Sequence, residues 1–188
     1  MEMIMNILAG YLLGSIPFGY LLVKLAGKGD VRDVGSGATG ATNVNRVGGM
    51  KLAVLTMVLD LLKAFFAVYF FGLWAGVAAV AGHNFPVWLG FKGGKGLASS
   101  GGFLLGLSPL AFLFSFAIWV IAALGFGYSS LAALIVLAIA PFAFGFAISN
   151  TAGWACVALA ALGFFQHRAN IKRLLNGTED KIKWKKKK

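Results

Sequence analysis

The chain has 188 residues, of which 59% are hydrophobic and only 12% are charged, and its mean hydropathy is +0.82. Soluble domains carry about 25% charged residues, so this composition excludes an ordinary soluble domain and predicts an all-α integral membrane protein. The net charge of +11 does not indicate nucleic-acid binding, because the cations flank apolar segments and gather near the C-terminus. The single cysteine, Cys156, excludes an internal disulfide bond.

About seven transmembrane helices, several of them short, are predicted from the apolar segments, within a single domain over residues 1–188. In chain order the segments are Met3–Leu25, Lys51–Gly72, Ala75–Gly90, Lys95–Gly106, Pro109–Leu124, Tyr128–Ile148 and Ala152–Phe165. The first exceeds the apolar core of a signal peptide, which has about 7–15 residues, and is therefore expected to be retained. Several connections are very short, so neighbouring helices are expected to be antiparallel. The pairs Gly10/Gly14, Gly72/Gly76 and Gly102/Gly106 have the spacing of close helix packing.

The distribution of lysine and arginine predicts the orientation of the chain. Of 17 such residues, only Lys63 falls deep within a predicted span, and the others lie in or beside loops of one side. Positive charge marks the cytoplasmic side, so we expect the N-terminus outside and the C-terminus in the cytoplasm. Residues 181–188 are then a polybasic cytoplasmic tail. The same orientation places three polar clusters at the cytoplasmic face, where together they can form one pocket for phosphate-bearing molecules.

The first cluster is Gly35–Arg46. Its first six residues match G-x-G-x-x-G, but no βαβ unit surrounds them and no Gly-Lys-Ser/Thr follows, so neither a dinucleotide site nor a P-loop is predicted. Glycine N–H groups, hydroxyls and an amide beside the guanidinium of Arg46 instead suit an anion site. A flexible loop is the alternative.

The second cluster is Phe91–Gly96, where one predicted span ends and the next begins. Anchoring at the membrane surface would by itself explain Lys92 or Lys95. The adjacent glycines favour a phosphate site, and Lys95 at the start of a helix is the stronger candidate.

Three ionisable residues lie within the predicted spans. His83 is expected to be hydrogen-bonded structure, with a polar lining of the site as the alternative. Asp60 and Lys63 are spaced to pair on one helix face, although contact of Lys63 with substrate stays open. Two histidines and no cluster of carboxylates do not predict a metal site.

The third cluster is His167–Leu174. His167 and Asn170, three residues apart, share a helix face, where histidine can accept a proton and asparagine can orient a hydroxyl. Arg168, Lys172 and Arg173 are expected to face lipid headgroups. No carboxylate lies in any of the three clusters.

At these residues the chain resembles the bacterial acyl-phosphate-dependent glycerol-3-phosphate acyltransferases, the PlsY family. The matching segments, in the family's order, are Gly14–Gly19, Gly35–Arg46, His83–Gly96 and His167–Glu179. One departure is Ala38, which stands where the family usually has Asn. The resemblance covers nearly the whole chain.

The resemblance implies transfer of a fatty acyl group from acyl phosphate to the sn-1 hydroxyl of glycerol 3-phosphate. The products would be lysophosphatidic acid and phosphate, in the first step of phospholipid synthesis. It also implies a multi-pass protein of the bacterial cytoplasmic (inner) membrane, with its active site facing the cytoplasm. The expected partners are both substrates, membrane lipid and the enzyme that supplies acyl phosphate, with no cofactor and no nucleic acid.

By motif match, the acyl-phosphate cradle is assigned to Ser36, Gly37, Gly40, Thr42, Gly93 and Gly94. The residues expected to meet glycerol 3-phosphate are Asn43, Arg46, Lys95, His167 and Asn170. Of these two sets, the expected catalytic residues are Ser36, Lys95, His167 and Asn170. Whether His167 or a substrate phosphate takes the proton is left open. An anion transporter is the main rival function and a membrane scaffold the second, although no internal repeat supports transport.

Overall fold

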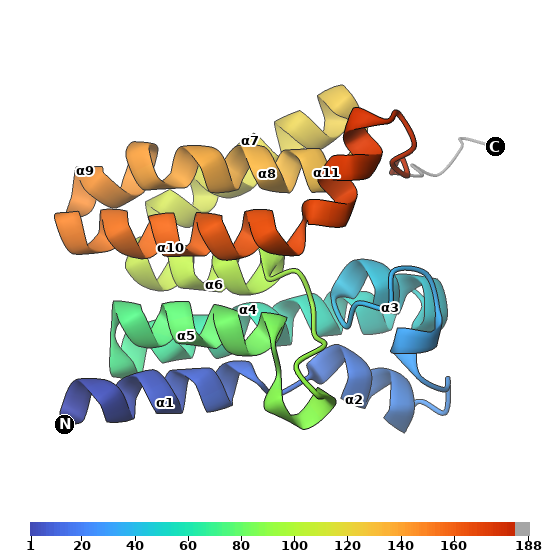
Figure 1. Cartoon of the computed structure of the whole chain (residues 1–188), viewed down its shortest axis with the longest axis horizontal. Coiled ribbons are helices and arrows are strands. Elements are labelled where there is room, and N and C mark those ends of the chain that lie inside the picture. The colour runs from blue at the N-terminus through green and yellow to red at the C-terminus, as the bar shows by residue number, and fades with distance from the viewer. Residues whose placement is uncertain (183–188) are drawn as a thin grey trace. The chain divides into compact units, whose positions relative to one another are not determined.

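The computed structural model describes residues 1–182, which form helices and connecting loops without a β-strand (Figure 1). They divide into two compact units, which meet in the chain between Phe112 and Leu113. Within residues 1–182, four helical stretches are long and apolar enough to cross a membrane: Glu2–Leu25, Met50–Phe71, Pro109–Phe126 and Ser129–Ile148. The prediction of an all-helical membrane protein is therefore confirmed. Residues 183–188 of the predicted tail lie outside the described residues.

The first unit contains α1 (Glu2–Gly14), α2 (Phe18–Leu25), the 3-10 turn η1 (Val31–Asp33), α3 (Ala41–Gly48), α4 (Met50–Phe71), α5 (Leu73–Asn84), the 3-10 turn η2 (Val87–Leu89), α6 (Leu97–Leu107) and the start of α7 (Pro109–Phe126). The predicted first span is thus divided in two. Its helix stops at Gly14 and resumes at Phe18, because Pro17 lacks an N–H group and its ring clashes with the preceding turn. The predicted third span also ends early, at Asn84, two residues before Pro86.

Glycines let the helices of the first unit approach closely. A side chain at Gly10 or Gly14 of α1 would collide with the backbone of α5, and one at Gly102 of α6 would collide with the Leu61 carbonyl of α4. The packing role predicted for these residues is confirmed. Gly72 differs, because it forms the turn between α4 and α5 with φ 89° and has open space around it.

The second unit contains the rest of α7, α8 (Ser129–Ala140), the π-helical turn η3 (Pro141–Gly145), α9 (Phe146–Ile148), α10 (Asn150–Gln166) and α11 (Arg168–Leu175). α10 packs against α8, η3 and α9, and α11 packs against α8. The predicted sixth span is therefore not one regular helix: its hydrogen bonding changes at Pro141, whose ring cannot donate to the preceding turn. Gly145 and Gly153 lie against each other, which brings η3 close to α10.

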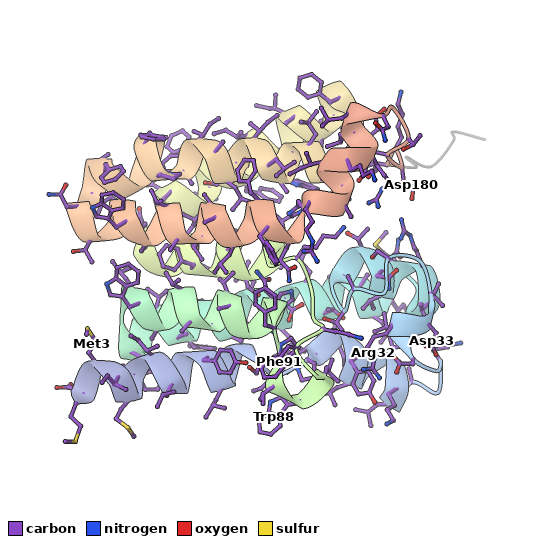
Figure 2. All side chains as sticks on the ribbon, in the orientation of Figure 1. Met3, Arg32, Asp33, Trp88, Phe91 and Asp180 are labelled. Carbon is purple, nitrogen blue, oxygen red and sulfur yellow. The ribbon has the colours of Figure 1, made fainter. Side chains whose placement is uncertain are left out.

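Large apolar side chains project outward from the helices of both units, as Figure 2 shows. Tyr69, Ile121 and Phe142 are 70%, 70% and 74% exposed. Apolar surface on this scale would be an aggregation liability in water, whereas it suits contact with lipid tails. The polar side chains that are buried are therefore the ones that need a structural or chemical explanation.

Candidate active site

The first polar cluster folds as a glycine loop followed by a short helix. α3 begins after Gly40, so that Thr42 and Asn43 lie in its first turn and Arg46 lies in its last. Gly35 and Gly37 adopt φ values of 63° and 68°, a left-handed conformation that favours glycine. No described side chain caps α3. The N–H group of Asn43 donates to the Gly40 carbonyl at 3.0 Å, and the positive end of the helix suits a negatively charged ligand.

Asn43 organises this loop from inside. Its side chain is only 2% exposed, and its Nδ2 group donates to the carbonyls of Val31 at 2.7 Å and Val34 at 2.9 Å. Its Oδ1 atom is buried and has no hydrogen-bond partner among the described residues. A buried acceptor without a donor is costly, so Asn43 both holds the loop and presents an acceptor suited to a hydroxyl group.

Gly35 brings the two predicted polar contacts of this cluster together. A Cβ atom at this position would lie 2.5 Å from Oδ1 of Asn43 and 2.7 Å from Nη1 of Arg46. Both side chains therefore lie against the Gly35 backbone. The hydroxyl-bearing residues Ser36 and Thr42 are exposed on the same loop and helix. Gly37 uses its N–H group within the loop, where it donates to the Val34 carbonyl at 3.2 Å.

The glycines of the second cluster form backbone hydrogen bonds within the first unit, and their predicted part in the acyl-phosphate cradle stays a prediction. Gly93 donates its N–H group to the carbonyl of Asn84 at 3.2 Å, and Gly94 donates to the carbonyl of His83 at 3.0 Å. These backbone donors, expected to cradle acyl phosphate, are therefore already engaged. The physical reason for glycine here is close approach: a side chain at Gly93 would collide with the His83 carbonyl, and one at Gly94 with the His83 ring.

Lys95 follows this pair of glycines directly and precedes α6, which begins at Leu97 with Gly96 as its N-cap. The prediction that Lys95 lies at a helix start is confirmed. Gly96 has φ 81°, and no described side chain caps α6. A phosphate at this position would meet the ammonium group of Lys95 and the positive end of the helix dipole together. Lys92 lies on the exposed part of the loop.

Asp60, Lys63 and His83 form a buried cluster inside the first unit. Nζ of Lys63 lies 2.8 Å from Oδ1 of Asp60, and Nδ1 of His83 lies 3.3 Å from the same oxygen atom. The predicted pairing of Asp60 with Lys63 is confirmed, and His83 is hydrogen-bonded structure as expected. Lys63 also donates to the Ile16 carbonyl at 2.9 Å. These two contacts hold the ammonium group of Lys63 in place within the first unit.

In the second unit, His167 joins α10 to α11 and is buried, with 3% of its surface exposed. Its Nδ1 atom lies 2.8 Å from the carbonyl of Gly163. A carbonyl can only accept, so Nδ1 carries the hydrogen and the lone pair of the neutral ring is on Nε2. His167 therefore has a fixed ring orientation and a defined atom that can accept a proton.

Glu179, which is not among the predicted site residues, binds Asn170 and Arg173 of this cluster. Its Oε1 atom accepts hydrogen bonds from Oγ of Ser130 and Nδ2 of Asn170, each at 2.6 Å, and its Oε2 atom accepts one from Nε of Arg173 at 2.7 Å. Burial acts to raise the pKa of Glu179, but these three hydrogen bonds outweigh burial and hold its pKa below the usual value. The guanidinium of Arg173 pairs with Glu179 and is still 42% exposed, and its predicted contact with lipid headgroups stays a prediction.

The contact with Glu179 also sets the orientation of the Asn170 amide. Asn170 is 4% exposed; its Nδ2 group donates to Glu179, while its Oδ1 atom is buried without a partner among the described residues. Asn170 thus presents an unsatisfied acceptor, as Asn43 does in the first unit. The sequence signal that could have revealed Glu179 is a single glutamate in a strongly basic C-terminal segment.

No group of three or more His, Cys, Asp or Glu side chains is placed to hold a metal ion within residues 1–182. The polar groups described above are amides, hydroxyls, cations and the two histidines His83 and His167. They also include the carboxylates of Asp60 and Glu179, each of which is hydrogen-bonded to neighbouring side chains. Such groups bind and orient anions and hydroxyls.

Comparison with known proteins gives concordant results. A family model described as glycerol-3-phosphate acyltransferase matches residues 4–177. The glycerol-3-phosphate acyltransferase of Mesorhizobium japonicum is 50% identical over 187 residues, which cover 96% of each chain. The enzyme of the same name from Rhodospirillum rubrum is 50% identical over 197 residues, covering 96% of this chain and 91% of that protein.

Solved structures agree with the sequence relatives. The crystal structure of PlsY, an integral membrane glycerol 3-phosphate acyltransferase, in its glycerol 3-phosphate form matches with a TM-score of 0.89 and 40% identity. Its lysophosphatidic acid form matches with a TM-score of 0.88 and 39% identity. Each match covers 97% of this chain and 96% of the other. The chain therefore belongs to the glycerol-3-phosphate acyltransferase family, PlsY.

Proposed function

We propose that this chain transfers a fatty acyl group from acyl phosphate to the sn-1 hydroxyl of glycerol 3-phosphate, producing lysophosphatidic acid and phosphate. The observation that carries the proposal is the match, over 97% of the chain, to PlsY in a glycerol 3-phosphate form and in a lysophosphatidic acid form. Those ligands are the acyl acceptor and the acylated product of this reaction. The buried acceptor atoms of Asn43 and Asn170 support a substrate that bears hydroxyl groups.

The chemistry requires little of the protein beyond binding and orientation. The hydroxyl oxygen of glycerol 3-phosphate attacks the carbonyl carbon of acyl phosphate, the new ester bond forms, and the bond from that carbon to the phosphate oxygen breaks. The hydroxyl proton passes to His167 or to the departing phosphate. Because acyl phosphate is a mixed anhydride with a good leaving group, no serine or cysteine nucleophile is needed. Positioning the two substrates and stabilising the developing negative charge supply the rate enhancement.

The residue roles follow from the chemistry of each cluster. Arg46 and Lys95 are proposed to bind phosphate through charge, and the exposed hydroxyls of Ser36 and Thr42 to donate to acyl phosphate. The proposed acceptors for substrate hydroxyls are Asn43, Asn170 and Nε2 of His167. Four glycines of the expected cradle, Gly37, Gly40, Gly93 and Gly94, are proposed to act chiefly by shaping the loops, since three of their N–H groups are engaged within the protein.

The arrangement in the membrane is part of the same proposal. We propose seven spans in a single domain, with the N-terminus outside, the C-terminus in the cytoplasm and the site at the cytoplasmic face of the bacterial inner membrane. Support comes from the one-sided distribution of lysine and arginine and from helices at each of the seven predicted segments. The acyl chain would then lie among apolar helices, and the enzyme that supplies acyl phosphate would deliver it from the same side.

The proposal is tested by giving purified protein palmitoyl phosphate and glycerol 3-phosphate in the presence of EDTA, with Lys95→Ala in parallel. We expect lysophosphatidate and phosphate in equal amounts from the wild type and a loss of at least about 100-fold in the variant. Well-folded wild-type protein that leaves palmitoyl phosphate intact would refute the proposal. Flux of phosphate into liposomes without acyl phosphate would then favour an anion transporter.

A further inference from the structure

Three ionisable side chains lie in the interior of the first unit, and none of them has a role in the reaction described above. Asp60, Lys63 and His83 are 2%, 3% and 5% exposed. An isolated charge in an apolar interior is costly, and the carboxylate of Asp60 is stabilised here by the ammonium group of Lys63 at 2.8 Å. Apolar residues would pack in this position at least as stably, so stability alone does not explain the charged cluster.

Lys63 connects this cluster to the break in the first span. Besides Asp60, its ammonium group donates to the carbonyl of Ile16, which lies between α1 and α2, and it lies 5.7 Å from the centre of the Phe18 ring. Lys63 therefore fixes α4 against the point where the proline interrupts the helix. Asp60 in turn is held in a single position by its paired lysine.

His83 connects the cluster to the glycine turn. A carboxylate can only accept, so Nδ1 of His83 donates to Asp60 and the ring is held at that edge. The opposite edge of the ring packs on Gly94, where an added Cβ would collide with Nε2 and lie 2.7 Å from Cε1. The N–H group of Gly94 also donates to the carbonyl of His83. Gly94 is thus held by both the ring and the backbone of one residue.

A second connection lies on the other side of Lys95. Oγ of Ser99, in the first turn of α6, donates to the backbone carbonyl of Asp60 at 3.0 Å. Gly94 and Ser99 lie on either side of Lys95 in the chain, so both ends of the Lys95 segment are fixed to the same buried cluster. The cluster is placed to define the position of the Lys95 backbone.

We infer that Asp60 and His83, neutralised and anchored by Lys63, form a buried support that positions Lys95 for the phosphate of its ligand. His83 and Ser99 are therefore positioning residues, which act on phosphate binding only through Lys95. The inference rests on the proposed function, in which Lys95 binds phosphate. It explains why a charged cluster lies behind a turn whose own N–H groups are already engaged.

The test compares Ser99→Ala with Ser100→Ala, the same change at the next buried position of α6, and adds His83→Gln. We expect Ser99→Ala and His83→Gln to speed amide hydrogen exchange in the peptide containing Gly93 and Gly94 by about threefold to tenfold, the effect of one hydrogen bond. The affinity for glycerol 3-phosphate, measured by calorimetry, should fall by about the same factor. Ser100→Ala should change neither quantity.

A double-mutant cycle separates positioning from general structure. In a Lys95→Ala background, Ser99→Ala should still speed exchange but should weaken glycerol 3-phosphate binding no further. An equal loss of affinity with and without Lys95, or unchanged exchange in both variants, would overturn the inference, as would a wild type that does not bind glycerol 3-phosphate. A wild type that binds glycerol 3-phosphate but leaves palmitoyl phosphate intact would count only against the proposed reaction.

Discussion

Replacing Glu179 by Gln is expected to loosen the C-terminal part of the second unit and to lower the catalytic rate. The carboxylate accepts hydrogen bonds from Ser130, Asn170 and Arg173 on its two oxygen atoms. An amide keeps one of those oxygen atoms and replaces the other by a donor. At least one of the three partners would then face a donor instead of an acceptor.

The size of the effect follows from burial and charge. The Glu179 side chain is 7% exposed, so water can replace little of what is lost. A hydrogen bond to a charged group contributes about 1.5–3 kcal/mol, and losing one should destabilise the protein by about 2 kcal/mol. For a chain of this length that lowers the melting temperature by about 4–8 °C.

The pH dependence has a definite sign. The folded-state pKa of Glu179 is lower than its usual value, so its stabilising contribution is complete above the unfolded pKa of about 4.3 and is lost as the pH falls through the folded pKa. The wild type should therefore lose stability in acid by an amount that Glu179→Gln does not lose. At neutral pH the difference between the two proteins should not vary with pH.

The assay is thermal unfolding in detergent at several pH values, followed by turnover at saturating substrate. Glu2→Gln, the same chemical change at an exposed glutamate, is the control and should behave as the wild type. Because Asn170 would lose its fixed amide orientation, we also expect kcat of Glu179→Gln to fall. A variant with the melting temperature and kcat of the wild type would refute the role assigned to Glu179.

Three further predictions address packing, the first cluster and the proton. Gly102→Ala should destabilise the protein by about 1–3 kcal/mol, because its Cβ would collide with the Leu61 carbonyl. The control Gly101→Ala should be tolerated, and equal melting temperatures of the two variants would contradict the prediction. Asn43→Leu removes two hydrogen bonds to loop carbonyls, so it should lower the stability of the protein and raise KM for glycerol 3-phosphate. An unchanged KM would count against the proposed role of Asn43 in binding this substrate. His167→Ala should slow turnover by about 100-fold or more if histidine takes the proton, and a fully retained rate would assign the proton to a substrate phosphate.

The helices could be predicted from sequence because hydropathy and turn residues act locally. Each predicted apolar segment contains a helix, and α6 begins close to Lys95, where the fourth span was predicted to start. The break at Pro17 was readable in principle, since proline removes a helical donor. The length of apolar sequence alone did not reveal it.

The interactions that define the site could not be predicted, because they join residues that are distant in sequence. Ser130 and Glu179 are 49 positions apart, and Ile16 and Lys63 are 47 apart. The contact of Gly94 with His83 could not be predicted for the same reason: a glycine that exposes its N–H group and one that admits a neighbouring ring look identical in sequence. Only the position of His83 distinguishes the two.

The most direct test of the central claim is the choice of acyl donor. Purified protein would receive glycerol 3-phosphate with either palmitoyl phosphate or palmitoyl-CoA, and the acylated product and released phosphate would be measured together, with the acyl position assigned by NMR. We expect one phosphate to be released for each 1-acyl product formed from palmitoyl phosphate, and no product to form from palmitoyl-CoA. Efficient transfer from palmitoyl-CoA, or a product acylated at the sn-2 position, would contradict it.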